Sequence, residues 1–187
     1  MPDIKSLVVV FGLFCGSAWA DTYTIDPAHT FPNFTINHLG FSTMHGRFNK
    51  TSGKLQMDLD KGTGSVEIII AADSIDTGHA KRNKHLRSDD FLRVKEFPSI
   101  TFKSTKVTFN GKKSAMVEGN LTIVGVTKPV SLKVDSINCG KHPFNKKDVC
   151  GFNATTAIKR SDFGVKYGLP AIGDDMNLEF EVEAIKN

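Results

Sequence analysis

The chain has 187 residues, with 24 Lys and Arg against 20 Asp and Glu, which gives a formal net charge of +4. That length suits one domain with an apolar core, and the basic excess is too small to indicate a nucleic-acid-binding protein. A hydrophobic fraction of 40% and a charged fraction of 24% are typical of a globular chain rather than a disordered one.

Residues 1–20 have the layout of a secretory signal peptide. Lys5 precedes an apolar run from Leu7 to Cys15. Ala18 and Ala20 are small residues at the two positions that a signal peptidase recognises before its cleavage site. The run is too short to cross a bilayer as an ordinary helix. We therefore expect cleavage after Ala20 and an exported domain of residues 21–187.

Apolar and polar residues alternate along much of that domain, most clearly near its C-terminus. There, Met176, Leu178 and Phe180 face one way, and the residues between them are polar. Many short strands with one apolar and one polar face indicate a closed antiparallel barrel or a sandwich. About eight strands are predicted, at residues 34–36, 55–59, 66–70, 100–102, 117–123, 130–134, 152–158 and 176–184.

Residues 76–91, "DTGHAKRNKHLRSDDF", interrupt this alternation. They contain good helix formers, and Asp76 or Thr77 is available as an N-cap. Residues 79–95 carry six Lys and Arg against two Asp. This segment predicts a helix whose basic face either lies in water or holds an anionic head group.

Two cysteines remain once the signal peptide is removed, Cys139 and Cys150. Two cysteines in a domain that is exported to an oxidising compartment predict a disulfide between them. The alternative is that both remain reduced thiols. A zinc site is disfavoured because there is no second cysteine pair.

Known catalytic and metal-binding motifs are absent from the sequence. His38 and His45 lie seven residues apart, so on a strand they would face opposite sides. There is no H-E-x-x-H, G-x-S-x-G or phosphate-binding glycine motif, and we predict no metal site and no catalytic cofactor. "KRSDFG", residues 159–164, has a catalytic appearance but is also typical of a strand that ends in a turn.

The 14 Phe residues are a more informative feature. Phe41, Phe48, Phe91 and Phe163 are among those that fall outside the best strand segments, where they could plug the ends of a barrel. An eight-stranded barrel is also wide enough to hold one slender ligand.

Four segments resemble the YceI family of periplasmic, lipocalin-like proteins that bind polyisoprenoid lipids. They are "YTIDPAHTFPNFTINHLGFSTMHGRF", "DFLRVKEFPSITFKS", "GNLTIVGVTKPVSL" and "KRSDFGVKYGLP", and the similarity runs in order from about Tyr23 to Ile185. The resemblance implies an all-β fold, an extended eight-stranded antiparallel lipocalin-like β-barrel with a short helix near its opening, often as a homodimer.

The resemblance also implies an isoprenoid lipid inside the barrel and no established catalytic activity. Some relatives are associated with b-type membrane cytochromes. Isoprenoid quinones such as ubiquinone are therefore candidate ligands beside polyprenols and polyprenyl phosphates, and a membrane or membrane cytochrome is a candidate transient partner.

We accordingly expect a periplasmic carrier that holds an isoprenoid lipid in a hydrophobic tunnel. One alternative is a small barrel enzyme that acts on an amphiphilic lipid through His38 or Asp162. Another is an outer-membrane barrel, which the polar outer faces of the strands disfavour. Arg82, His85 and Arg160 are the candidate head-group contacts. The candidate lining residues are Phe34, Ile36, His38, Phe41, Phe48, Ile68, Ile70, Phe91, Phe102, Leu121, Ile123, Phe163 and Tyr167.

Overall fold

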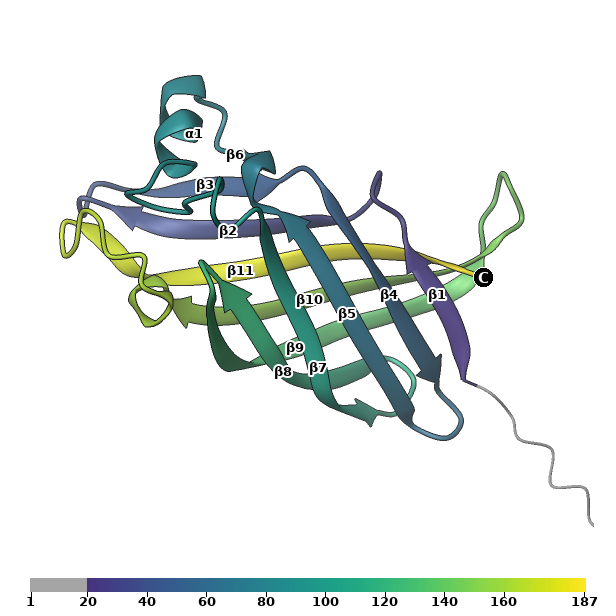
Figure 1. Cartoon of the computed structure of the whole chain (residues 1–187). Helices are drawn as coiled ribbons and strands as arrows, with labels where there is room; N and C mark the ends of the chain where they lie inside the picture. The colour runs from purple at the N-terminus through teal and green to yellow at the C-terminus, as the bar shows by residue number, and fades with distance from the viewer. Residues whose placement is uncertain (1–19) are drawn as a thin grey trace, which may run out of the picture.

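The computed structural model describes residues 20–187, so nearly all of the predicted signal peptide lies outside the described residues. The chain forms strands, one α-helix and two short 3-10 helices (Figure 1). In chain order these are β1 (Asp21–Ile25), β2 (Phe31–His38), β3 (Ser42–Phe48), β4 (Thr51–Asp58), β5 (Thr63–Ala71), η1 (Ala72–Ser74), β6 (Ile75–Asp76), α1 (Ala80–Leu86), β7 (Ser99–Asn110), β8 (Ser114–Ile123), β9 (Val126–Lys141), β10 (Asp148–Lys159), η2 (Arg160–Phe163) and β11 (Ile172–Lys186).

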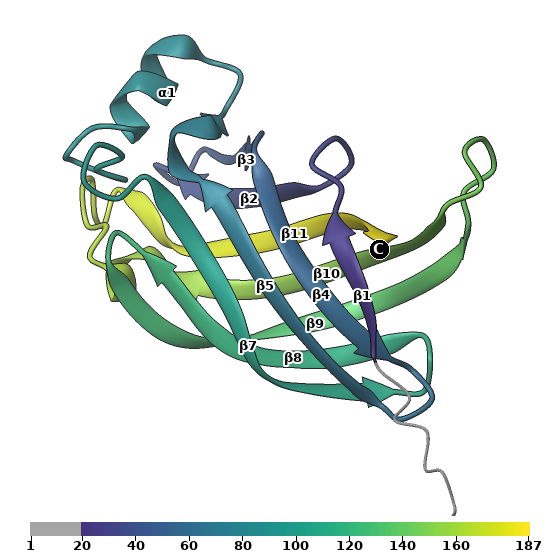
Figure 2. The ribbon, with the colours of Figure 1, turned by 45° about the vertical axis from the view of Figure 1, so that its right-hand side comes forward.

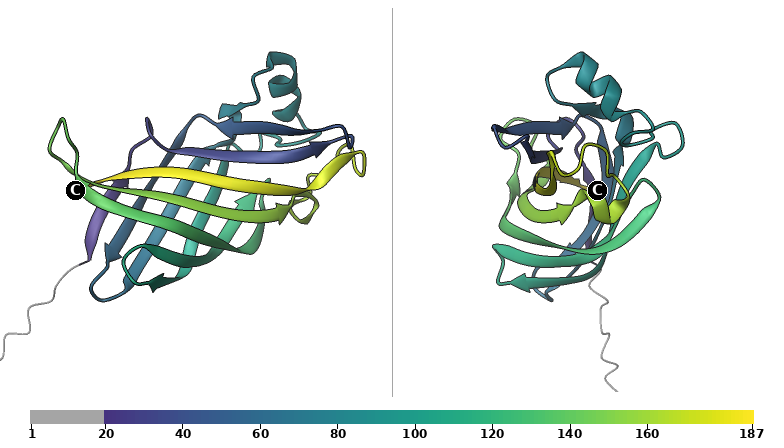
Figure 3. Two further views of the ribbon diagram at one scale, coloured as in Figure 1. Left: turned by 180° about the vertical axis from the view of Figure 1, so that it is seen from behind. Right: turned by 90° about the vertical axis from the view of Figure 1, so that its left-hand side faces the viewer.

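The strands close into one antiparallel barrel. Each of β1, β4, β5, β7, β8, β9, β10 and β11 pairs with the next, and β1 pairs with β11 to complete the circle. The end-on view in Figure 3 shows the closed wall. The predicted eight-stranded antiparallel barrel is confirmed. Each predicted strand segment lies within an observed strand, except that segment 55–59 runs one residue past the end of β4.

Three additional strands lengthen the wall at one end. β2 pairs with β11 beyond the part that pairs with β1, β3 pairs with β2, and the short β6 pairs with the end of β3. β1 and β2 thus form one interrupted wall strand, and β3 and β4 form another (Figure 2). The expectation that Phe48 lies outside the strands is wrong, because only a tight turn separates β2 from β3 and Phe48 is the last residue of β3.

The segment between β5 and β7 leaves the wall and covers this same end. α1 is shorter than predicted and begins after His79, whose ring Nδ1 accepts a hydrogen bond from the Arg82 backbone N–H. The predicted caps Asp76 and Thr77 are wrong because Asp76 is held in β6 by pairing with Arg47. No residue of α1 is buried, so the helix is a cover and not part of the core.

The opposite end carries the long β9–β10 hairpin and the predicted disulfide (Figure 1). Cys139 and Cys150 lie directly opposite each other in the two strands and are bonded, with an S–S distance of 2.04 Å. No helix within residues 20–187 is long and apolar enough to cross a membrane.

Candidate functional site: two joined apolar cavities

The barrel contains a wide cavity of about 520 Å³ on the side of α1. Inward side chains of β2, β3, β5, β7, β8, β10 and β11 form its walls. Residues of β6, α1, the segment after α1, η2 and the loop between η2 and β11 also line it. Lys81, His85 and Tyr167 line the cavity and are also exposed to solvent, so the cavity reaches the surface here. We call this end, with α1, the β2–β3 turn and loop 164–171, the α1 end.

A deeper chamber of about 140 Å³ continues from the wide cavity into the barrel. Five residues line both spaces, so the two lie end to end along the barrel interior, and we describe them together as one elongated space. The shared residues are Pro32, Ile70, Leu121, Leu178 and Phe180.

Charged groups are found only at one end of this elongated space. Among residues 20–187, no Lys, Arg, Asp or Glu lines the deeper chamber, whereas Lys81, Arg82 and Arg160 line the wide cavity. One buried hydroxyl of the deeper chamber, Thr51 Oγ1, has no hydrogen-bond partner in this part of the chain. The space is therefore apolar at depth and polar at the α1 end.

Strand parity explains most of the lining. Phe34, Ile36 and His38 are spaced by two along β2 and all line the wide cavity. His45 sits opposite Thr35 in the register, on the outward parity of β3, whereas Met44 and Gly46 face inward. The two histidines lie on different strands, β2 and β3, and not on the single strand that the spacing argument assumed. Both border the wide cavity, although His45 is exposed.

Twelve of the thirteen candidate lining residues border one or both spaces. Ile68 and Phe102 line the deeper chamber, while Ile70 and Leu121 line both. The wide cavity alone is bordered by Phe34, Ile36, His38, Phe48, Phe91, Ile123, Phe163 and Tyr167.

Phe41 borders neither space and is 89% exposed. It follows the two-residue turn of Leu39 and Gly40, whose positive φ angles of 57° and 75° reverse the chain at the end of the barrel. We therefore correct the expectation that Phe41 lines the tunnel. Asp162, named for the enzyme alternative, is likewise exposed and outside both linings.

Arg82 and His85 line the wide cavity but already have partners. Arg82 donates from Nε to Thr77 Oγ1 at 2.8 Å and from Nη2 to the Thr77 carbonyl at 2.7 Å. The His85 Nε2 atom lies 2.8 Å from Asp90 Oδ2. The His85 ring also packs edge-on against Phe91 and Tyr167, at centroid distances of 5.0 and 5.1 Å.

Arg160 is buried, at 4% exposure, and holds a loop in place. Its guanidinium donates to the backbone carbonyls of Gly173 (2.8 Å), Val165 (3.0 Å), Tyr167 (2.9 Å) and Ile172 (3.1 Å). Burial lowers the pKa of this guanidinium. Most of its donors are used within the protein, so it shapes loop 164–171 at the cavity end.

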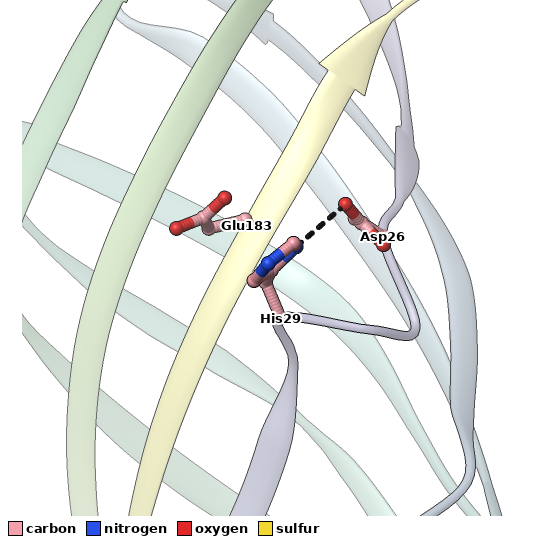
Figure 4. Close-up of side chains that lie close together, drawn as sticks. All are labelled: Asp26, His29 and Glu183. Carbon is pink, nitrogen blue, oxygen red and sulfur yellow. Dashed lines mark hydrogen bonds and ion pairs between the residues drawn. The ribbon is translucent and has the colours of Figure 1, made fainter. Parts of the chain in front are cut away.

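Sequence spacing missed one group of possible metal ligands, Asp26, His29 and Glu183 (Figure 4). Each of these three side chains offers one potential ligand atom, and the three atoms all lie within 4.8 Å of one another. It lies outside the barrel, where β1 breaks and the chain rejoins β11. His29 Nδ1 is 2.9 Å from Asp26 Oδ2, and this hydrogen bond raises the pKa of His29 and lowers that of Asp26. The geometry is that of an ion pair, and His29 must lose its proton before it could bind a metal.

Comparison with known proteins identifies the family. A family model described as a YceI-like domain matches residues 23–184. The chain belongs to the YceI family.

YceI relatives match it along almost its whole length. A "UPF0312 protein" of Pseudomonas aeruginosa is 42% identical over 187 residues, covering 98% of this chain and 97% of its own. The crystal structure of the Campylobacter jejuni YceI protein is 31% identical with a TM-score of 0.72, covering 81% of this chain and 90% of its own. A domain from Saccharophagus degradans described as polyisoprenoid binding shares the fold, with 17% identity, a TM-score of 0.66 and coverage of 88% and 98%.

Motif residues by which the sequence resembles YceI proteins occupy tight packing positions in this structure. A Cβ atom on Gly46 would lie 2.3 Å from the Phe34 ring, and one on Gly119 would lie 2.4 Å from the Phe102 ring. Those two rings border the wide cavity and the deeper chamber respectively. The glycines therefore make room for aromatic side chains that form the cavity walls.

The candidate list left out many lining residues that strand parity could have supplied. Met176, Leu178 and Phe180 on β11 line the wide cavity, as their alternation allows. Val165 in the loop and Ile172 at the start of β11 also line it, and Arg160 donates hydrogen bonds to the carbonyls of both. No local pattern in the sequence identifies them.

Proposed function

We propose that the protein is a periplasmic carrier that holds the tail of an isoprenoid lipid in the two joined cavities. The head group, a quinone or the alcohol or phosphate of a polyprenyl lipid, stays at the α1 end. A bound lipid, and no catalytic cofactor, is what this function requires.

The distribution of polarity along the cavity carries this proposal. A chain of methyl-branched isoprene units gains about 0.8 kcal/mol for each methylene-sized group moved out of water. The deeper chamber offers apolar walls without charged side chains, and Lys81, His38 and His85 border the wide cavity near the surface. Apolar walls at depth and polar groups near the surface suit an amphiphile whose tail occupies the deeper chamber and whose head group stays near the opening.

Relatives support the ligand class. The Saccharophagus degradans domain of the same fold is described as polyisoprenoid binding, so a barrel of this kind can accept such a chain. The signal-peptide pattern of residues 1–20 and the cystine support an exported, oxidising location. A homodimer and a transient membrane cytochrome partner stay predictions of the family resemblance.

The direct test is extraction with organic solvent of protein purified from its native host, followed by mass spectrometry. We expect a stoichiometric isoprenoid lipid. The purified protein, stripped of lipid, should also take up ubiquinone or a polyprenol from detergent micelles. Absence of any isoprenoid from repeated preparations, together with no uptake in vitro, would refute the carrier function.

The same extraction separates a carrier from an enzyme. A carrier returns its lipid chemically unchanged after prolonged incubation, and replacement of His38 by Gln alters affinity only. Conversion of the lipid by the wild type, lost in His38→Gln, would assign the barrel a catalytic function instead.

A further inference from the structure

We propose that the α1 end is a docking surface for an anionic lipid bilayer, and that Leu39 and Phe41 enter the head-group region. This inference deepens the carrier function, because it assigns the place where lipid is exchanged. It rests on an exposed apolar turn, on unpaired lysines beside it and on the position of the cavity.

The apolar turn is exposed and held rigidly. Phe41 is 89% exposed and Leu39 46%. Gly40 N donates to Asn37 Oδ1 at 2.9 Å, and Phe41 N donates to the His38 carbonyl at 3.0 Å, which closes the turn. Turns with positive φ at both central positions favour Asn, Asp and Gly, so Leu39 is an unusual residue here, and nearly half of its surface is exposed.

The turn is continuous with the edge of the cavity. Leu39 N donates to the carbonyl of Ala171 at 3.1 Å, which joins it to the loop that contains Tyr167. Tyr167 is 48% exposed and packs against His85 and Phe91, each at a centroid distance of 5.1 Å. The turn, the loop and the α1 segment therefore form one edge around the wide cavity (Figures 1 and 3).

Charge at this edge complements an anionic surface. Lys81 and Lys84 on α1 and Lys166 in the loop are exposed, and their ammonium groups form no ion pair or hydrogen bond with any residue from 20 to 187. Exposed acids also lie near this end. Asp90 pairs with His85, Glu96 with Arg93 and Asp175 with Lys159, while Asp89 and Asp162 follow α1 and Arg160. Basic groups beside an exposed aromatic residue are typical of proteins that bind the surface of an anionic bilayer.

The opposite end carries an equally exposed aromatic residue but no cavity opening. Phe144 is 89% exposed in the β9–β10 turn. Of the exposed lysines beside it, Lys141 pairs with Asp148 at 2.9 Å and Lys146 donates to the Pro143 carbonyl at 2.8 Å, while Lys147 adds a further positive charge. Neither cavity is lined by residues of this turn. Phe144 is therefore a matched internal control for Phe41.

Co-sedimentation with vesicles tests the proposal. We expect the purified protein to bind vesicles made of phosphatidylcholine and phosphatidylglycerol in equal parts, and to bind pure phosphatidylcholine vesicles far less. Phe41→Ser should weaken binding to the anionic vesicles about tenfold. Lys81→Gln with Lys84→Gln should weaken it roughly thirtyfold. Phe144→Ser should leave it unchanged.

Uptake from detergent micelles separates this proposal from the carrier function. Phe41→Ser should still take up lipid from micelles with unchanged affinity, but should exchange it with anionic vesicles more slowly. Failure of the wild type to bind anionic vesicles, or equal losses in Phe41→Ser and Phe144→Ser, would overturn the docking proposal even where micellar uptake succeeds. A Phe41→Ser variant that binds vesicles normally but changes from dimer to monomer would assign the turn to a protein interface and also overturn it.

Discussion

The ring of Phe34 lies directly over Gly46 in the neighbouring strand. The two residues face each other in the β2–β3 register, and a Cβ on Gly46 would lie 2.3 Å from Phe34 Cζ. The absence of a side chain lets the Phe34 ring lie across the strand, 6.1 Å from the ring of Phe48. This glycine thus shapes the wall of the wide cavity.

Replacement of Gly46 by Val should therefore displace Phe34 and lower the free energy of unfolding by about 2 kcal/mol. Chemical denaturation measures the loss. Gly140→Val is the matched control, because Gly140 also lies in a strand and has nothing within 4 Å of an added Cβ. Equal stabilities of the two variants would contradict the packing role of Gly46.

Arg160→Leu should lower the free energy of unfolding by about 3 kcal/mol, because four backbone carbonyls lose a charged donor. Proteolysis should then begin in loop 164–171. Lys159→Gln removes a neighbouring exposed cation that pairs with Asp175, and it should change stability little. An Arg160→Leu variant that is as stable as Lys159→Gln, yet binds lipid weakly, would instead make Arg160 a head-group ligand.

Removal of the cystine by Cys139→Ser with Cys150→Ala should lower the free energy of unfolding by about 3 kcal/mol, since the closed loop no longer restricts the unfolded chain. Lipid uptake from micelles should not change, because neither cysteine lines a cavity. Urea denaturation and micellar uptake check the two parts, and reduced uptake in the folded variant would show that the cavity depends on the bond.

The His29–Asp26 pair should give a defined pH dependence. The hydrogen bond to Asp26 raises the pKa of His29 above 6.5, so the stabilisation from His29 is complete below pH 6.5 and is lost as pH rises through the raised pKa. The hydrogen bond from His29 lowers the pKa of Asp26 below 3.8, so its contribution is complete above pH 3.8 and is lost as pH falls through the lowered pKa. The pair therefore stabilises the fold most fully between those two values.

An NMR titration of the His29 ring measures this interaction. Asp26→Asn should bring the pKa of His29 down, whereas Asp60→Asn, at the distant β4–β5 turn, should not. A midpoint unaffected by Asp26→Asn would show that the hydrogen bond is not formed in solution.

Ala154→Leu should shorten the space available to a lipid tail. Ala154 is buried and lines only the deeper chamber. The added carbons should weaken binding of a long-tailed quinone about tenfold and leave a short-tailed quinone unaffected. Fluorescence competition with the two quinones measures the difference, and Met116→Leu, on an exposed position of β8, is the control. Equal losses for both tails would show that the deeper chamber does not hold the tail.

Alternation predicted the barrel and much of its interior, because a strand places every second residue on one face. Phe34, Ile36 and His38 follow from that rule alone. The positions of the loop residues could not be predicted from that rule, because they depend on tertiary contacts. Phe163 lies inside the barrel and Phe41 lies outside it, although both are phenylalanines next to a turn. The buried Arg160 network holds the first, and the Leu39–Gly40 turn directs the second away from the barrel.

The cystine gives the two ends of the barrel different mechanical strength. At the end far from α1, a covalent bond ties β9 to β10. The described residues of the α1 end contain no such bond. There, loop 164–171 is held by the hydrogen bonds of Arg160, by ring packing between Tyr167, His85 and Phe91 and by the hydrogen bond from Leu39 N to the Ala171 carbonyl. We therefore expect any widening of the barrel to break these non-covalent contacts at the α1 end, where the proposed lipid would enter and leave.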